Sequence, residues 1–164
     1  VRVIALPVRM VTRAEYEAAS REYERWEQER PAPDDVTATS CRFVMMKRYE
    51  RVMKRYLEQE QNPVYDTEVH VVRLGDVAFA TNPFELFLDF GLRIKARSQA
   101  LQTFIVQLTG TGKNAISCYL PTAKAVAAKS YGAEVADNVV GPEAGQLLVD
   151  RTVEMINALW PEAT

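Results

Sequence analysis

The stretch EVHVVRLGDVAFAT, residues 68–81, predicts a β-hairpin. Two apolar-rich runs flank Gly75-Asp76, and glycine next to aspartate between such runs is a typical two-residue hairpin turn. The Asn82-Pro83 pair ends the second run. The stretch therefore predicts two strands, Glu68–Leu74 and Val77–Thr81, and the rest of the fold can be built outward from them.

The segment after the hairpin predicts a helix over residues 84–98. Pro83 suits the entrance of a helix, where its missing amide proton costs nothing, and Asn82 is a favourable N-cap. This assignment places Glu85 in the first helical turn, where the helix dipole favours a negative charge. From the pattern alone, helix stabilisation is the simplest role for Glu85.

A further strand is predicted over Leu101–Leu108, and a loop rich in glycine and small polar residues follows it. In an α/β unit of this kind, Glu85 and Tyr119 both come just after the carboxyl ends of strands. Open α/β sheets bind their ligands at that position. Taken alone, Tyr119 is equally well explained as a packed loop aromatic.

The flanking segments complete a mixed α/β fold, in which residues 1–62 and 63–164 are two parts of one domain or domain fragment. The first part predicts an edge strand with Pro7 in it and then a helical hairpin, whose first helix starts at the capping box Thr12–Glu15 and whose second helix covers Ser40–Gln61. In the second part, Gly141-Pro142 starts a C-terminal helix that packs on a mixed sheet.

Composition limits the possible partners. The 164 residues carry 20 basic and 22 acidic side chains, so no global field attracts nucleic acid. The second predicted helix is locally basic, but glutamates interrupt its basic run, so a nucleic-acid partner is not predicted. No apolar run approaches the roughly 18–20 residues that span a bilayer. Because the chain starts at Val1, we expect a processed chain or an excised fragment, and such a fragment should expose an apolar face and associate, including with its own copies.

Several common sites are excluded or disfavoured by residue type. The single histidine, His70, rules out a zinc site that needs two histidines from this chain, and its mid-strand position disfavours a serine–histidine triad. The two cysteines, Cys41 and Cys118, match no metal or redox spacing. Gly110-Thr-Gly-Lys113 lacks the first glycine and the final serine or threonine of a phosphate-binding loop, so nucleotide binding is not predicted.

Four segments together resemble the neutral/alkaline ceramidase family, in the last part of its zinc amidohydrolase domain. These segments are LGDVAFATNPFELF (residues 74–87), GLRIK (91–95), FIVQL (104–108) and YLPT (119–122), and the similarity continues through YGAE (131–134) and GPEAG (141–145). The resemblance covers roughly residues 65–160, while the first 60 residues match no motif of the family.

This resemblance implies that Glu85 and Tyr119 are zinc ligands. It also implies that the parent protein hydrolyses an N-acyl amide of a lipid-like substrate, with the histidine ligands and the serine nucleophile supplied by an upstream segment or domain. Many family members act outside the cytoplasm, but the chain itself carries no targeting signal. With two ligands, the chain alone should bind zinc weakly and be catalytically inactive.

The sequence departs from the family pattern at three places. Phe84 stands where the family commonly has glycine or threonine, the loop before Tyr119 lacks the family's first tyrosine, and Tyr131-Gly132 replaces a Tyr-Glu pair. The last two departures weaken the expectation of ceramide itself as the substrate. The competing interpretation is a non-catalytic α/β domain that packs against another domain or another copy.

Overall fold

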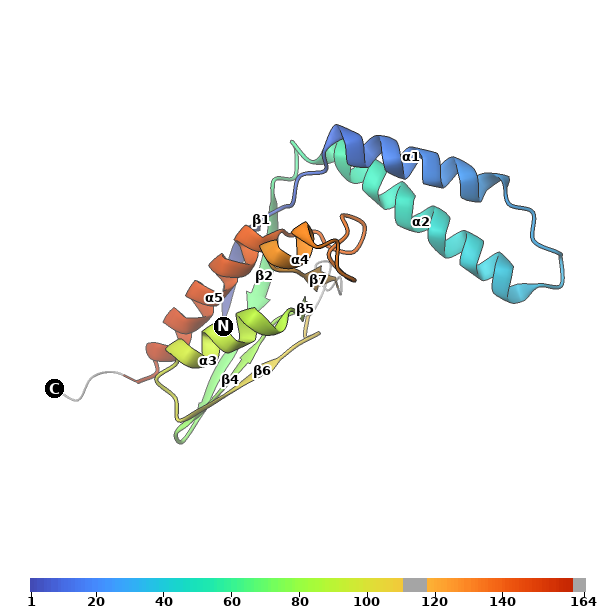
Figure 1. The fold of residues 1–164 in the computed structure, drawn as a ribbon. Coiled ribbons are helices and arrows are strands. Elements are labelled where there is room, and N and C mark those ends of the chain that lie inside the picture. Colours follow the sequence, from blue (N-terminus) through green and yellow to red (C-terminus); the bar gives the residue numbers. More distant parts are fainter. Residues whose placement is uncertain (111–117, 161–164) are drawn as a thin grey trace. The chain divides into compact units, whose positions relative to one another are not determined.

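The computed structural model describes residues 1–110 and 118–160, which form two compact units (Figure 1). Unit 1 combines Val1–Arg9 with the described residues from Val64 onward, and unit 2 is Met10–Pro63. The first strand of the chain therefore belongs to the same unit as the C-terminal segment, because it pairs with a strand that begins at Val64.

Unit 2 is the predicted helical hairpin. Helix α1 covers Arg13–Gln28, and its predicted capping box is confirmed, since Thr12 accepts from the Glu15 amide while Glu15 bonds back to Thr12. Helix α2 covers Val36–Glu58 and begins earlier than the predicted Ser40, because the Asp35 carboxylate caps the Ala38 amide. The two helices pack through apolar stripes that include the Tyr16 and Tyr56 rings, whose centroids lie 4.7 Å apart.

Unit 1 is a mixed α/β structure, as predicted. Its elements are the strands β1 Arg2–Pro7, β2 Val64–Val69, β3 Val71–Leu74, β4 Val77–Thr81, β5 Glu85–Leu86, β6 Gln102–Val106 and β7 Tyr119–Leu120, and the helices α3 Leu88–Arg97, α4 Ala123–Ala127 and α5 Pro142–Asn157. Strands β1 and β2 form an antiparallel pair, a mixed sheet has the order β3-β4-β6, and β5 pairs in parallel with β7.

The mixed sheet contains the predicted hairpin and carries its helices on one face. Leu74 and Val77 are paired across the turn, and Gly75 has a positive φ of 60°, which glycine adopts without strain. Ala78 and Ala80 of β4 are buried, and helices α3 and α5 lie side by side over this part of the sheet (Figure 1). The prediction of a C-terminal helix that packs on a mixed sheet is confirmed.

The opposite face of this sheet carries apolar side chains that the described residues leave partly exposed. Alternate residues of a strand point to opposite faces, and one row across β3, β4 and β6 consists of Val72, Phe79 and Phe104. The Phe79 and Phe104 rings are stacked with centroids 5.2 Å apart, yet Phe104 is 45% exposed and Val72 is 56% exposed.

The predicted helix start at Phe84 is wrong. Glu85 and Leu86 form β5, and α3 begins only at Leu88, so Glu85 does not lie in a helical turn. The physical reason is that the amides of Glu85 and Phe87 donate to the carbonyl oxygens of Cys118 and Leu120 instead of forming helical hydrogen bonds. These bonds require an extended backbone at residues 85–87. Asn82 does cap an amide, but it is that of Phe84 in a local turn, at 3.1 Å.

None of the helices in residues 1–110 and 118–160 combines the length and the apolar character needed to cross a membrane.

Candidate metal-ligand pair

The parallel pairing of β5 and β7 places Glu85 and Tyr119 next to each other. They are direct register partners, and Leu86 is paired with Leu120 in the next position. Neighbouring strands lie about 4.8 Å apart, and residues in register point to the same face of the sheet. The sequence pattern predicted that both residues come just after the carboxyl ends of strands. In the structure each is instead the first residue of a two-residue strand, and these two strands are adjacent.

Backbone and core contacts fix this short ladder. The Glu85 amide donates to the Cys118 carbonyl oxygen at 3.0 Å, and the Phe87 amide donates to the Leu120 carbonyl oxygen at 3.2 Å. The side chain of Gln107 binds both backbone groups of Leu86, accepting from its amide at 2.9 Å and donating to its carbonyl oxygen at 3.3 Å. Leu86 and Leu120 are buried, so the strands are anchored in the core while Glu85 and Tyr119 are half-buried.

The Tyr119 ring is held on several sides. Tyr131 packs edge-on against it at 5.5 Å between centroids, and Phe87 packs edge-on at 6.4 Å. Gly132, with a φ of 74°, lies directly against the ring, since a Cβ atom at Gly132 would be only 2.6 Å from Tyr119 Cγ. A glycine is therefore required at this position both by its backbone conformation and by the ring beside it.

The phenol of Tyr119 is held in its protonated form. Hydrogen bonding to Tyr131 raises the pKa of Tyr119, hydrogen bonding to Glu85 raises it further, and desolvation and the charge of Glu85 act in the same direction. A neutral hydroxyl that donates to a carboxylate loses this interaction when it ionises, which explains the sign. The Tyr119 hydroxyl thus stays protonated well above the ordinary pKa of a tyrosine, with Tyr131 and Glu85 as its neighbours.

Tyr119 should ionise only above the ordinary pKa of a tyrosine. Its folded-state pKa lies above the unfolded value of about 10, so its contribution to stability is complete below that pH and is lost as the pH rises further. An alkaline titration followed by tyrosinate absorbance should show one late component, and Tyr119→Phe should remove that component. Loss of an early component instead would contradict the assignment.

The donor pair fits part of a zinc site. A carboxylate oxygen is an ordinary zinc ligand at about 2.0–2.2 Å. A phenol oxygen becomes one when a cation replaces its proton. The described residues contain no group of three or more histidine, cysteine, aspartate or glutamate side chains that could hold a metal. Glu85 and Tyr119 are two candidate donors, fewer than the four that a tetrahedral zinc ion needs.

The sequence analysis also considered His70, Cys41 and Cys118. His70 occupies the one-residue break between β2 and β3 rather than the middle of a strand, and it bonds Glu68. Cys41 is exposed, Cys118 is buried, and neither of them forms a disulfide. Most of the Gly110–Lys113 stretch, for which nucleotide binding was not predicted, lies outside the described residues.

Sequence reasoning missed the parts that Tyr131 and Gly132 play around Tyr119. It noted them only as a departure from the family pattern. The sequence signal that could have identified them is the Tyr-Gly pair itself, since a glycine between larger residues often marks a positive φ or a close approach. Which ring lies against that glycine becomes visible only in three dimensions.

Comparisons of the chain with protein-family models, with curated proteins and with solved structures found no match.

Proposed function

We propose that this chain supplies Glu85 and Tyr119 as two zinc ligands of an amidohydrolase similar to the neutral/alkaline ceramidases. The parent protein would cleave N-acyl amides of a lipid-like substrate, and the chain alone would be inactive. The observation that carries the proposal is the register pairing of Glu85 with Tyr119. The resemblance selects these two residues from the sequence alone, and adjacent strands then place them beside each other.

Each residue of the cluster has a role in this proposal. Glu85 provides a carboxylate that is already oriented by the bonded strand, and Tyr119 provides an oxygen that gives up its proton in exchange for the cation. Tyr131 and Gly132 position the Tyr119 ring. Bound zinc would act as a Lewis acid on the amide carbonyl. An upstream segment or domain would provide the histidine ligands and the serine nucleophile.

Zinc titration of the full chain by calorimetry tests this proposal. Weak binding at one site is expected, because two ligands leave half of a tetrahedral ion unprotected. Glu85→Gln and Tyr119→Phe should each weaken that binding at least tenfold. Asp89→Asn, which removes an exposed carboxylate from the first turn of α3, is the matched control and should bind like the native chain.

Two results would contradict the proposal. Zinc binding that neither Glu85→Gln nor Tyr119→Phe weakens would place the metal elsewhere. Hydrolysis of an N-acyl lipid by this chain alone, lost in Glu85→Ala, would show that the chain is a complete enzyme rather than a contributor of ligands.

A second candidate function is that of a non-catalytic α/β interaction domain on the same scaffold. The open apolar row Val72–Phe79–Phe104 favours it, because contiguous exposed apolar surface of this kind commonly marks a protein–protein contact. The occupant would be an upstream domain or a second copy. Absence of zinc binding, even in the presence of the upstream segment, would support this function over the metal-ligand role.

A further inference from the structure

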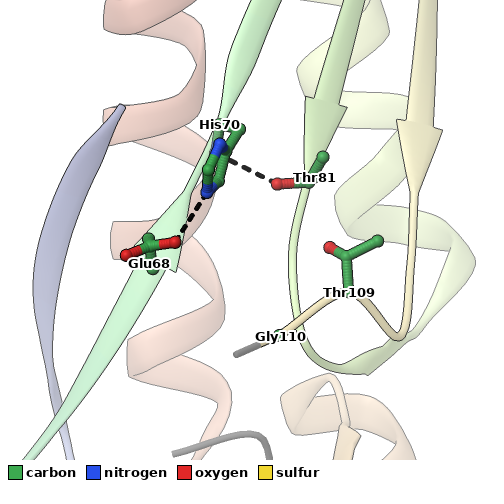
Figure 2. A pocket seen from close by; sticks show the side chains of 5 residues that line it. All are labelled: Glu68, His70, Thr81, Thr109 and Gly110. Carbon is green, nitrogen blue, oxygen red and sulfur yellow. Dashed lines mark hydrogen bonds and ion pairs between the residues drawn. The ribbon is translucent and has the colours of Figure 1, made fainter. Parts of the chain in front are cut away.

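A cavity of about 200 Å³ lies at the carboxyl end of β4, and neither Glu85 nor Tyr119 is among its described lining residues (Figure 2). Three separate stretches of chain line it: the β2–β3 junction, the end of β4, and the segment after β6. The described lining residues are Glu68, His70, Thr81, Thr109 and Gly110. A cavity with convergent polar groups at the ends of parallel strands is a typical ligand site of α/β sheets.

The wall of this cavity is mostly apolar and carries a few polar groups. His70 Nε2 lies 2.7 Å from Glu68 Oε1, and the His70 amide donates to the Thr81 hydroxyl oxygen at 3.0 Å. The Thr109 hydroxyl donates to the Asn82 carbonyl oxygen at 3.0 Å, which leaves the Thr109 oxygen lone pairs as acceptors. Glu68 adds a negative charge, and none of the described lining residues is a lysine or an arginine. This set complements a cation that donates hydrogen bonds and disfavours an anion.

The cavity is close to the candidate metal ligands along the chain. Thr81 lies on its wall, and Glu85 follows four residues later, so their Cα atoms are at most about 14 Å apart. Asn82 links the two regions, because its carbonyl oxygen accepts from the Thr109 amide and its side chain accepts from the Phe84 amide.

Amide hydrolysis produces a group that fits this cavity. One water is consumed, a C–O bond forms at the acyl carbon, and the C–N bond breaks. The nitrogen leaves with a proton from the water, and a second proton passes from the new carboxylic acid to the amine. The products are a carboxylate and an ammonium ion. Of these two, the ammonium ion is the hydrogen-bond-donating cation.

We propose that this cavity binds the ammonium group of the amine released by amide hydrolysis, with the Glu68 carboxylate as its counter-ion and the threonine hydroxyl oxygens as acceptors. The inference rests on the proposed function for the identity of the amine. It narrows the substrate class to amides whose amine half carries an apolar group, because the wall of the cavity is mostly apolar.

Propylammonium is the probe, and propionate, of similar size and opposite charge, is its control. Both are titrated in EDTA into the ¹⁵N-labelled full chain, and the imidazole signals are followed by NMR. The chain has a single histidine, so these signals belong to His70 alone. Propylammonium should shift them in a saturable way, and propionate should not.

Glu68→Gln keeps the side-chain shape, removes the charge, and should weaken propylammonium binding at least tenfold. Asp66→Asn removes a charge from the same face of β2 outside the cavity lining and should change binding less than twofold. Amide spectra of both variants check that they fold. Propionate binding as strong as that of propylammonium, or unchanged binding in Glu68→Gln, would overturn the proposal.

Because EDTA removes zinc, the propylammonium titration tests the ammonium site independently of zinc binding to Glu85 and Tyr119. A saturable propylammonium shift without zinc binding to Glu85 and Tyr119 would leave the ammonium site standing and refute the metal-ligand role. Zinc binding without a propylammonium shift would refute the ammonium site and leave the metal-ligand role standing.

Discussion

Phe84→Ala is expected to lower the free energy of unfolding by about 3–5 kcal/mol, the usual effect of removing a fully buried phenylalanine ring. Phe84 is 0% exposed in the core of unit 1, where its ring lies 6.0 Å from that of Tyr65. The loss should be measured by urea denaturation. Phe104→Ala makes the same exchange on the open face of the sheet and should cause a much smaller loss, because that ring is already 45% exposed.

Equal losses in the two variants would contradict the assignment of Phe84 to the core. Comparing Phe84→Ala with Phe104→Ala also tests the role of position 84, where the ceramidases that this sequence resembles commonly have glycine or threonine. In this chain a large side chain immediately before Glu85 fills the core, so the residue before the candidate ligand also anchors it.

Gly132→Ala is expected to reduce zinc affinity at least tenfold, to the level of Tyr119→Phe. The added Cβ would lie 2.6–2.9 Å from three atoms of the Tyr119 ring, so the ring must shift from its present position. The positive φ of 74° adds strain of about 1–3 kcal/mol for a residue other than glycine. Calorimetric zinc titration and urea denaturation measure the two effects separately.

Gly75→Ala is the control that separates the steric clash with the Tyr119 ring from the backbone strain of a positive φ. Gly75 also has a positive φ, of 60°, but a Cβ there would meet no atom within 4 Å. This control should lose stability through strain and keep native zinc affinity. Equal zinc affinity in Gly132→Ala and Gly75→Ala would show that the Tyr119 ring does not need its present position to bind the metal.

Local signals predicted most of the elements, because each depends on a few neighbouring residues. The capping box at Thr12, the turn at Gly75-Asp76 and the helix start at Pro142 are all confirmed. In each case the residues that decide the structure lie within four positions of one another. Such features are independent of what the rest of the chain does.

The assignment of Glu85 to a helix failed because the deciding contacts are distant in sequence. The pattern Asn82-Pro83 is a good helix start, but the Glu85 amide donates to Cys118 and the side chain of Gln107 binds Leu86. Neither partner is visible from the local pattern. Tertiary hydrogen bonds overrode the local preference, and the same bonds bring Glu85 and Tyr119 together.

Pro7 and Val64 are register partners at one end of the antiparallel pair β1–β2. Antiparallel partners have Cα atoms about 4.5–5.5 Å apart, a gap that a short turn can bridge. The helical hairpin between them is therefore an insertion in a continuous β-hairpin, and a designed turn of a few residues could replace it while both strands keep their pairing. During synthesis, β1 leaves the ribosome first and must wait for its partner strand until the whole insertion has emerged.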